Sequence, residues 1–220
     1  NKVNIYDLYV LKTPANYSDF IYCITIMLQW NKIAKLGFFY RRNFNYNLAP
    51  YFTKRGKILD IGSGAGHPDL KKYGEVISCD ISIEMLKKNT QKLVNCDASN
   101  LPFKPKSFDY VTSFATFHHL PKREGEKFLS EIYRVLKSDG IAYLTYGYLS
   151  QKGKIDIKWS TVSRTYYSFD INSVKKMLIS SKFSSYELFS GSESKKIVTY
   201  SKNKEEFQEH FKNMILILKK

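Results

Sequence analysis

The sequence predicts an α/β domain built on a mainly parallel sheet, and three observations lead to this fold class. Short apolar runs that suit buried strands alternate with segments of helical periodicity along most of the 220 residues. A glycine-rich turn follows the first of these runs. Acidic residues stand at the ends of that run and of the next two. In open α/β sheets, strand ends of this kind are where ligands bind.

The glycine-rich turn is the feature around which the chain is organised. The first strand is expected at 57–61, and glycines occupy every second position of 62–66. Glycine lacks a Cβ and tolerates positive φ, so such a turn can lie directly against a ligand. The turn lacks the Lys-Ser/Thr pair of a P-loop, and His67 and Pro68 stand where the dinucleotide motif could place its last glycine.

Three acids support a nucleoside as the ligand. Asp60 lies at the end of the first strand, Asp80 ends a second apolar run at 75–80, and Asp97 ends a third at 93–97. In nucleotide-binding α/β folds the acid that follows the second strand accepts hydrogen bonds from ribose hydroxyls. The turn and the acids together predict a nucleoside site that is not arranged to hold a pyrophosphate.

The remaining elements follow from periodicity and turn residues. Segment 195–201 is expected to form an antiparallel hairpin with 185–190, and 205–220 to be a helix packed on the domain. The polar, basic stretch 147–164 shows no periodicity and is expected to be a functional or mobile loop. Other expected strands are 108–114 and 141–146, and other expected helices are 17–36, 68–73, 82–88, 122–136 and 168–178. These elements give an N-terminal helical or lid segment at 1–56, a central domain at 57–203 and a C-terminal helix at 204–220.

Composition favours one ordinary domain in a reducing compartment. The apolar fraction is 43%, no stretch has the length of a membrane span, and no cleavable signal pattern is present, so a cytoplasmic location is expected. Cys23, Cys79 and Cys96 are odd in number and lack metal or redox spacing. We expect them to be unpaired apolar side chains, with neither a disulfide nor a bound metal.

The net charge of +15 is concentrated at the two ends of the chain. Residues 1–56 carry a net +6, residues 57–150 a net +2, and residues 151–220 a net +7. Positive flanks around a nearly neutral centre favour a polyanionic partner, and RNA is the obvious candidate. A lysine-rich proteome is the alternative explanation of the same charge.

Five ordered blocks resemble class I S-adenosylmethionine-dependent methyltransferases, in the branch that includes the quinone methylases. They are 58–66, 79–86, 97–103, 107–120 and 131–140. The resemblance implies a Rossmann-like three-layer sandwich with a seven-stranded, mostly parallel sheet and an antiparallel C-terminal hairpin. It also implies an S-adenosylmethionine-dependent methyltransferase, with S-adenosylmethionine as the cofactor.

The same resemblance implies which residues bind that cofactor. Asp97 is similar to the acid that reads the adenine amino group, with the backbone of Ala98 beside it, and Ile81 or Met85 would flank the ring. Simple helix packing explains Met85 equally well. The start of the helix at 68–73 would favour the methionine carboxylate. The full set is Asp60, Gly62, Ser63, Gly64, Ala65, Gly66, Asp80, Ile81, Met85, Asp97, Ala98, Ser99, Phe114 and Ala115.

Candidates for catalysis lie in two places. His118 and His119 follow the fourth strand, and either could act as a general base or position a substrate. Adjacent side chains diverge, so a shared metal ion is not expected. Arg41 and Arg42 lie among aromatics and asparagines at 38–46, which suits a lid that contacts substrate, or else a packed aromatic layer with both arginines in solvent.

A narrower resemblance concerns the acceptor. Segments 154–159 and 164–174 look like the region after the fifth strand in methyltransferases that esterify a carboxymethyl group on the wobble uridine of tRNA. This implies a tRNA substrate and a small activating subunit. The acceptor residues would be Arg41, Tyr46, His118, Tyr146, Trp159, Arg164 and Tyr166. A small-molecule methylase for quinones or lipids, and a non-catalytic cofactor-binding RNA scaffold, are the alternatives.

Overall fold

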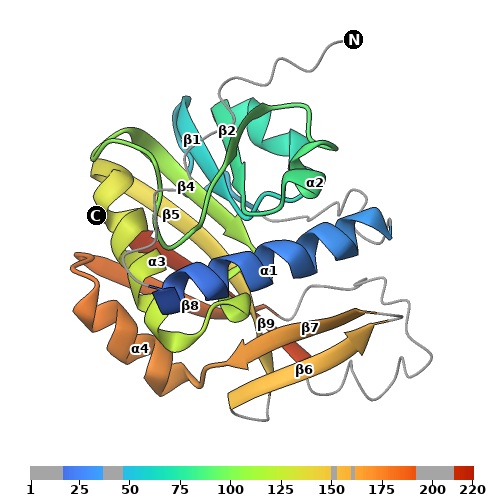
Figure 1. Cartoon of the computed structure of the whole chain (residues 1–220). Coiled ribbons are helices and arrows are strands. Elements are labelled where there is room, and N and C mark those ends of the chain that lie inside the picture. Colours follow the sequence, from blue (N-terminus) through green and yellow to red (C-terminus); the bar gives the residue numbers. More distant parts are fainter. Residues whose placement is uncertain (1–16, 37–46, 150–152, 160–161, 192–210) are drawn as a thin grey trace.

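A computed structural model of the chain describes residues 17–36, 47–149, 153–159, 162–191 and 211–220 (Figure 1). Seven strands form the main sheet in the order β3-β2-β1-β4-β5-β9-β8, and β6 pairs with β7 in a second, two-stranded sheet. Neighbours among β1 to β5 are parallel, whereas β9 runs antiparallel to both β5 and β8. The predicted Rossmann-like class is confirmed. The strands of the main sheet are β1 (Gly56–Ile61), β2 (Gly74–Asp80), β3 (Lys92–Asn95), β4 (Phe108–Phe114), β5 (Leu136–Leu149), β8 (Ser185–Gly191) and β9 (Phe211–Lys219).

Helices cover the sheet and its carboxyl edge. One face packs against α3 through the buried side chains of Phe128, Leu129 and Ile132, which lie on one side of that helix. Helix α1 crosses the edge at which β1, β2, β4 and β5 end (Figure 1). The helices are α1 (Tyr17–Lys35), η1 (Pro68–Tyr73), α2 (Ile83–Leu86), η2 (Phe117–His119), α3 (Lys122–Val135) and α4 (Ile171–Ser180), of which η1 and η2 are 3₁₀ helices.

The predicted C-terminal helix is wrong, because residues 211–219 are the strand β9. This strand inserts between β5 and β8, so its central residues 214–218 are covered on both sides, and four of the five are buried. A buried strand reads as a continuous apolar run, which periodicity alone does not separate from a helix. The strand expected at 195–201 lies outside the described residues, and the partner of β8 is β9.

The described residues of 147–164 also do not form a loop. Strand β5 continues to Leu149, and β6 (Gly153–Trp159) pairs with β7 (Val162–Ser168). In β7 every second side chain is buried, and two of those four are polar, Arg164 and Ser168. A strand that turns polar side chains inward lacks the apolar alternation on which sequence-based assignment depends.

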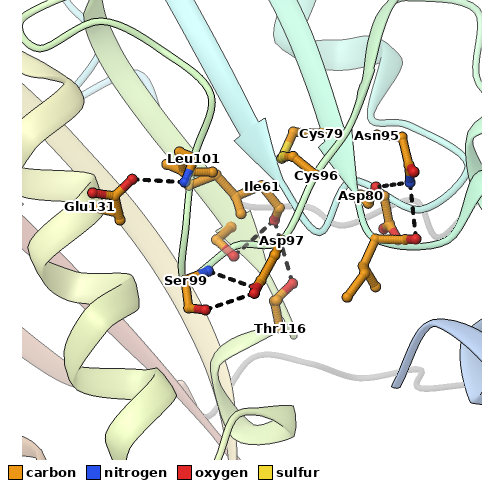
Figure 2. Close-up of a disulfide and its surroundings, with 12 residues drawn as sticks. Ile61, Cys79, Asp80, Asn95, Cys96, Asp97, Ser99, Leu101, Thr116 and Glu131 are labelled. Atoms are coloured by element: carbon orange, nitrogen blue, oxygen red, sulfur yellow. Dashed lines mark hydrogen bonds between the residues drawn. A yellow bond between two sulfur atoms is a disulfide. The ribbon is translucent and has the colours of Figure 1, made fainter. Parts of the chain in front are cut away.

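The expectation that all cysteines are unpaired is wrong as well, since a disulfide joins Cys79 to Cys96 (Figure 2). Cys79 lies on β2, and Cys96 directly follows the neighbouring strand β3. Their Cα atoms are 6.0 Å apart, although 17 positions separate them in the sequence. Parallel pairing brings them together, which their spacing alone does not reveal.

Within the described part of the chain, no helix is long and apolar enough to cross a membrane.

Candidate cofactor and acceptor site

The glycine turn offers open backbone at one position. Gly62 and Gly64 have φ of 65° and 53°, values that L side chains rarely adopt. A Cβ at Gly62 would lie 2.0 Å from Thr116 Oγ1, whereas a Cβ at Gly64 would meet nothing within 4 Å. The space above Gly64 is therefore a cradle for a ligand. Beside it, Ser63 Oγ is buried and has no hydrogen-bond partner among the described residues.

Asp80, at the end of β2, ties the glycine turn to the next loop. Its Oδ2 accepts a hydrogen bond from Gly64 N and its Oδ1 from Ser82 N, both at 2.8 Å. Ser82 in turn caps α2, because its Oγ accepts from Met85 N. Burial raises the pKa of Asp80 to about 6, and the charge of Asp60 adds to the increase, while the hydrogen bonds from Ser82 N and Gly64 N oppose it.

This pKa predicts that cofactor binding weakens in acid. Ribose hydroxyls donate to an ionised carboxylate, whereas Asp80 in the cofactor-free protein takes up a proton below about pH 6. Binding must then release that proton, so the dissociation constant should rise roughly tenfold per pH unit below about 6 and be flat above 7. Calorimetric titration with S-adenosylhomocysteine between pH 5 and about 8 would measure this. A profile that is flat to pH 5 would show that Asp80 does not accept from the ribose.

Asp97 lies in the loop just beyond β3, because that strand ends at Asn95, two residues earlier than expected. The side chain of Asn95 donates to Asp80 O and Ile81 O and so fixes the strand ends (Figure 2). Asp97 accepts hydrogen bonds from the backbone and the hydroxyl of Ser99. Its Oδ2 also accepts from Cys23 Sγ of α1 at 3.0 Å. Helix α1 therefore contacts the acid that was predicted to read adenine.

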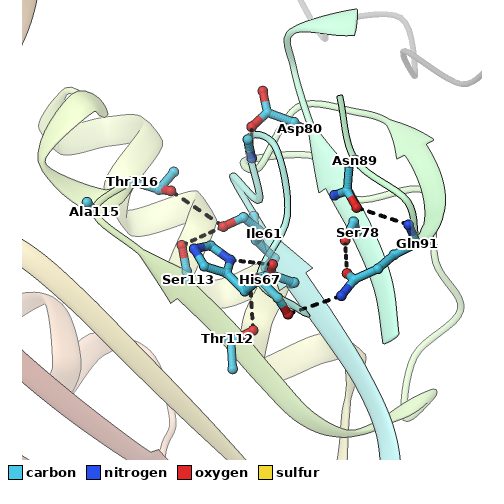
Figure 3. Close-up of polar contacts among 12 residues, drawn as sticks. Ile61, His67, Ser78, Asp80, Asn89, Gln91, Thr112, Ser113, Ala115 and Thr116 are labelled. Carbon is cyan, nitrogen blue, oxygen red and sulfur yellow. Dashed lines mark hydrogen bonds and ion pairs between the residues drawn. The ribbon is translucent and has the colours of Figure 1, made fainter. Parts of the chain in front are cut away.

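Asp60 lies at the end of β1 and is fully buried. Its Oδ1 accepts from Thr112 Oγ1 of β4 at 2.9 Å, and its Oδ2 lies 2.8 Å from His67 Nδ1 (Figure 3). Gln91 Nε2 donates to His67 O and holds the end of the turn. At the end of β4, Phe114 contacts the His67 ring, and Ala115 adopts a φ of 60°. A positive φ in a residue other than glycine is often found at functional sites.

The two adjacent histidines have different proton positions. His118 Nδ1 accepts from Gly147 N at 2.8 Å, so this histidine is neutral and carries its proton on Nε2. His119 Nδ1 lies 2.7 Å from Thr165 O, and a carbonyl oxygen can only accept. In its neutral form His119 therefore has its lone pair on Nε2. Of the two candidate bases, only His119 presents a basic Nε2.

Strand β7 brings acceptor candidates to the same histidines. The Tyr166 ring stacks on His118, with centroids 5.0 Å apart, and the guanidinium of Arg164 lies 5.4 Å from the Tyr166 ring. Arg164 is 8% exposed. From α1, the Trp30 ring meets the His119 ring edge-on at 4.8 Å. Residues of β7, η2 and α1 thus form one aromatic and cationic cluster.

Other predicted acceptor residues are placed differently. Tyr146 is 1% exposed and packs on Phe117 in the core, so it presents no surface to a substrate in this structure. Trp159 lies on β6 opposite Val162. Arg41, Arg42 and Tyr46 lie outside the described residues. Among the cofactor candidates, Met85 packs in a cluster with residues of α1 and β7, as the helix-packing interpretation expects.

Several residues at this edge of the sheet were not identified from the sequence. Thr112 of β4 bonds to Asp60, and Thr116, just after β4, lies against Gly62. From α1, Cys23 contacts Asp97 and Asn31 contacts Ser82. Asn31 Oδ1, for example, accepts from the Ser82 hydroxyl. These contacts join residues 51 to 74 positions apart in the chain. No local sequence pattern marks such residues, and only the glycine turn indicated the position of the site.

The comparisons with known proteins agree with this geometry. A family model described as a methyltransferase domain matches residues 59–144. This match identifies a methyltransferase domain at 59–144. A protein of Methanosarcina mazei, solved as an S-adenosylmethionine-dependent methyltransferase, has the same fold, with a TM-score of 0.63 and 18% identity over 79% of this chain and 96% of that one.

Curated relatives match the domain at higher identity but over part of their length. The domain is 41% identical over 106 residues to an uncharacterised protein of Methanocaldococcus jannaschii, covering 46% of this chain and 39% of the relative. It is 32% identical over 115 residues to a tRNA (carboxymethyluridine(34)-5-O)-methyltransferase of Arabidopsis thaliana, covering 50% and 28%. It is 34% identical over 104 residues to a demethylmenaquinone methyltransferase of Lactiplantibacillus plantarum, covering 40% and 43%. The chain therefore spans less than half the length of each of these three relatives.

The residues present fit S-adenosylmethionine, the cofactor of this domain. The open backbone at Gly64 leaves room for the ligand to lie against the turn. Asp80 has the acceptor oxygens that ribose hydroxyls need, and Asp97 offers a carboxylate for the adenine amino group. The cofactor and the acceptor cluster would meet at the carboxyl edge beneath α1.

Proposed function

We propose that the protein methylates a carboxylate carried by tRNA, the carboxymethyl group of a wobble uridine. The observation that carries this proposal is the buried guanidinium of Arg164 beside the His118 and Tyr166 rings. A guanidinium binds a carboxylate through two parallel hydrogen bonds, which fixes the orientation of that carboxylate. An anionic acceptor group therefore suits this side of the site better than an amine.

For this reaction the protein mainly has to align the acceptor carboxylate with the methyl group of the cofactor. S-adenosylmethionine supplies a methyl group bound to its sulfonium sulfur, which leaves with the bonding electrons as a neutral thioether. A carboxylate is already a nucleophile at neutral pH, so no general base is needed. Arg164 would hold one edge of the acceptor while the glycine turn and Asp80 hold the cofactor in line with it. Tyr166 and Trp30 would exclude water from the space between the cofactor and the acceptor.

The relatives and the charge support an RNA-borne acceptor. The Arabidopsis relative is named for methylation of carboxymethyluridine in tRNA, and a mouse relative, 27% identical over 131 residues, is named a probable tRNA methyltransferase. The net charges of +6 and +7 at the two ends of the chain would attract the phosphate backbone. A small activating subunit, as the resemblance implies, belongs to the same proposal.

A small-molecule acceptor is the second candidate, and one observation favours it. The lone pair on His119 Nε2 could take a proton from a quinol hydroxyl, and one relative is a demethylmenaquinone methyltransferase. A base is required for a hydroxyl acceptor and not for a carboxylate. The two candidates therefore differ in whether His119 is essential to the reaction.

Radiolabelled methyl transfer tests the proposal. Label should enter tRNA that carries carboxymethyluridine, and mild alkali should release it because the product is an ester. The Arg164→Ala variant should lose roughly tenfold or more in kcat/KM, from the loss of a charge-assisted hydrogen bond. Arg123→Ala, at an exposed arginine of α3, is the matched control and should not change the rate.

Three results would contradict the proposal. Label that enters a quinone or lipid extract instead of tRNA would favour the small-molecule reaction. Protein that binds tRNA but neither binds nor turns over the cofactor would be an RNA scaffold. An Arg164→Ala variant as active as the wild type would show that Arg164 does not bind an acceptor carboxylate.

A further inference from the structure

The pair formed by Asp60 and His67 has no role in the site as described so far. His67 is the residue at which the glycine turn departs from the dinucleotide spacing. Its Nδ1 lies 2.8 Å from Asp60 Oδ2, and the His67 side chain is 14% exposed while that of Asp60 is fully buried. Because the carboxylate can only accept, Nδ1 must carry the proton, and this bond fixes the direction of the ring.

The ring lies where the amino-acid end of the cofactor is expected. It packs edge-on against Phe114, with centroids 4.7 Å apart, and so bridges the carboxyl ends of β1 and β4. In the strand order β3-β2-β1-β4-β5, the chain builds the sheet outward in opposite directions from β1 and from β4, so the order reverses between these two parallel strands. Ligands of open α/β sheets bind in the crevice at such a reversal. His67 is therefore part of that crevice.

Among the described residues, the helix that follows the turn is a weak source of positive charge. The sequence predicted a helix at 68–73 whose start would attract the methionine carboxylate. The structure has only the six-residue 3₁₀ helix η1 there. A helix of this length and type has few aligned peptide dipoles, so its N-terminus attracts an anion weakly. An imidazolium at His67, paired with Asp60, would supply the charge that this helix does not.

We propose that His67 binds the α-carboxylate of S-adenosylmethionine. In this arrangement Nδ1–H donates to Asp60, and Nε2–H of the charged ring donates to the carboxylate of the cofactor. Asp60 acts as a positioning residue, and its negative charge complements the imidazolium. The inference rests on cofactor binding by this domain and does not depend on which acceptor is methylated.

Three ligands separate the contribution of the carboxylate from that of the nucleoside. They are S-adenosylmethionine, its decarboxylated analogue and 5′-methylthioadenosine, which lacks the amino-acid end. The His67→Asn variant keeps an amide N–H near the position of Nδ1 for Asp60, but has nothing at the position of Nε2. We expect it to bind S-adenosylmethionine roughly tenfold or more weakly, the effect of losing a charge-assisted hydrogen bond. Its affinity for the other two ligands should match that of the wild type, as measured by calorimetry at one pH.

The outcomes distinguish this inference from the cofactor assignment. An equal loss for all three ligands would show that His67 only supports the turn. Wild-type protein that binds S-adenosylmethionine no more tightly than its decarboxylated analogue would overturn the inference without any variant. No binding of any of the three ligands to the wild type would overturn the cofactor assignment and this inference with it.

Discussion

The Asp80→Asn variant should bind S-adenosylmethionine roughly 100-fold more weakly than the wild type while remaining folded. An ionised carboxylate can accept from both ribose hydroxyls, and such charge-assisted bonds contribute about 1.5–3 kcal/mol each. An asparagine keeps one acceptor oxygen and places an NH₂ group where the other oxygen was. In this protein the same two oxygens also hold Gly64 N and Ser82 N, so the substitution disturbs both walls of the nucleoside site.

Folding should survive this change because ionised Asp80 is not well accommodated by its surroundings. Burial raises the pKa of this group to about 6, so at neutral pH the folded protein holds a charge that its environment disfavours. An uncharged side chain of the same shape removes that cost. Thermal unfolding of the variant should therefore differ little from that of the wild type.

The matched control is Glu75→Gln, an exposed acid on the same strand that pairs with Lys92. Exposed pairs of this kind contribute little, so this variant should keep wild-type affinity. Calorimetric titration of both variants would measure the difference. If Asp80→Asn binds as tightly as Glu75→Gln, the assignment of the ribose to the end of β2 is wrong.

Reduction of the Cys79–Cys96 disulfide should lower the free energy of unfolding by about 3 kcal/mol, the expected effect of opening a cross-link that closes a short loop. The bond joins residues 17 positions apart, and it limits the conformations of the unfolded chain. In the folded protein β2 and β3 remain hydrogen-bonded with or without it. The domain should therefore stay folded after reduction, with a lower midpoint of unfolding.

Urea unfolding with and without a phosphine reductant would measure this difference. The Cys79→Ala/Cys96→Ala variant is the control, because its midpoint should be low and should not respond to the reductant. A wild-type midpoint that is unchanged by reduction, under conditions that release both thiols, would show that the disulfide does not stabilise the fold. Cys23 lies outside this comparison, since it is a free thiol that contacts Asp97.

The cofactor half of the site was predictable because its signals are local. A buried strand, a turn with glycine at every second position and an acid at the next strand end all lie within 57–80. In a parallel sheet the carboxyl ends of adjacent strands meet at one edge, so the meeting of Asp60 and Asp80 follows from the order of the elements. The structure places both acids at this edge, and it adds a hydrogen bond from Gly64 N to Asp80 that was not predicted.

The errors concern segments whose state depends on distant neighbours. An apolar run such as Met214–Leu218 suits either a helix or a strand until β5 and β8 are seen on its two sides. The strand β7 turns Arg164 inward, which a polar sequence does not indicate. Cys79 and Cys96 form a bond only because β2 and β3 pair in parallel.

By itself the sequence determined the class of fold and the ligand-facing turn, since both follow from residue types at short, regular spacing. Only the tertiary structure decided the proton positions of His118 and His119, the contact of α1 with Asp97 and the pairing of His67 with Asp60. Each of these depends on the direction of a hydrogen bond or on the approach of a remote element. Such features arise from packing, and no pattern of neighbouring residues encodes them.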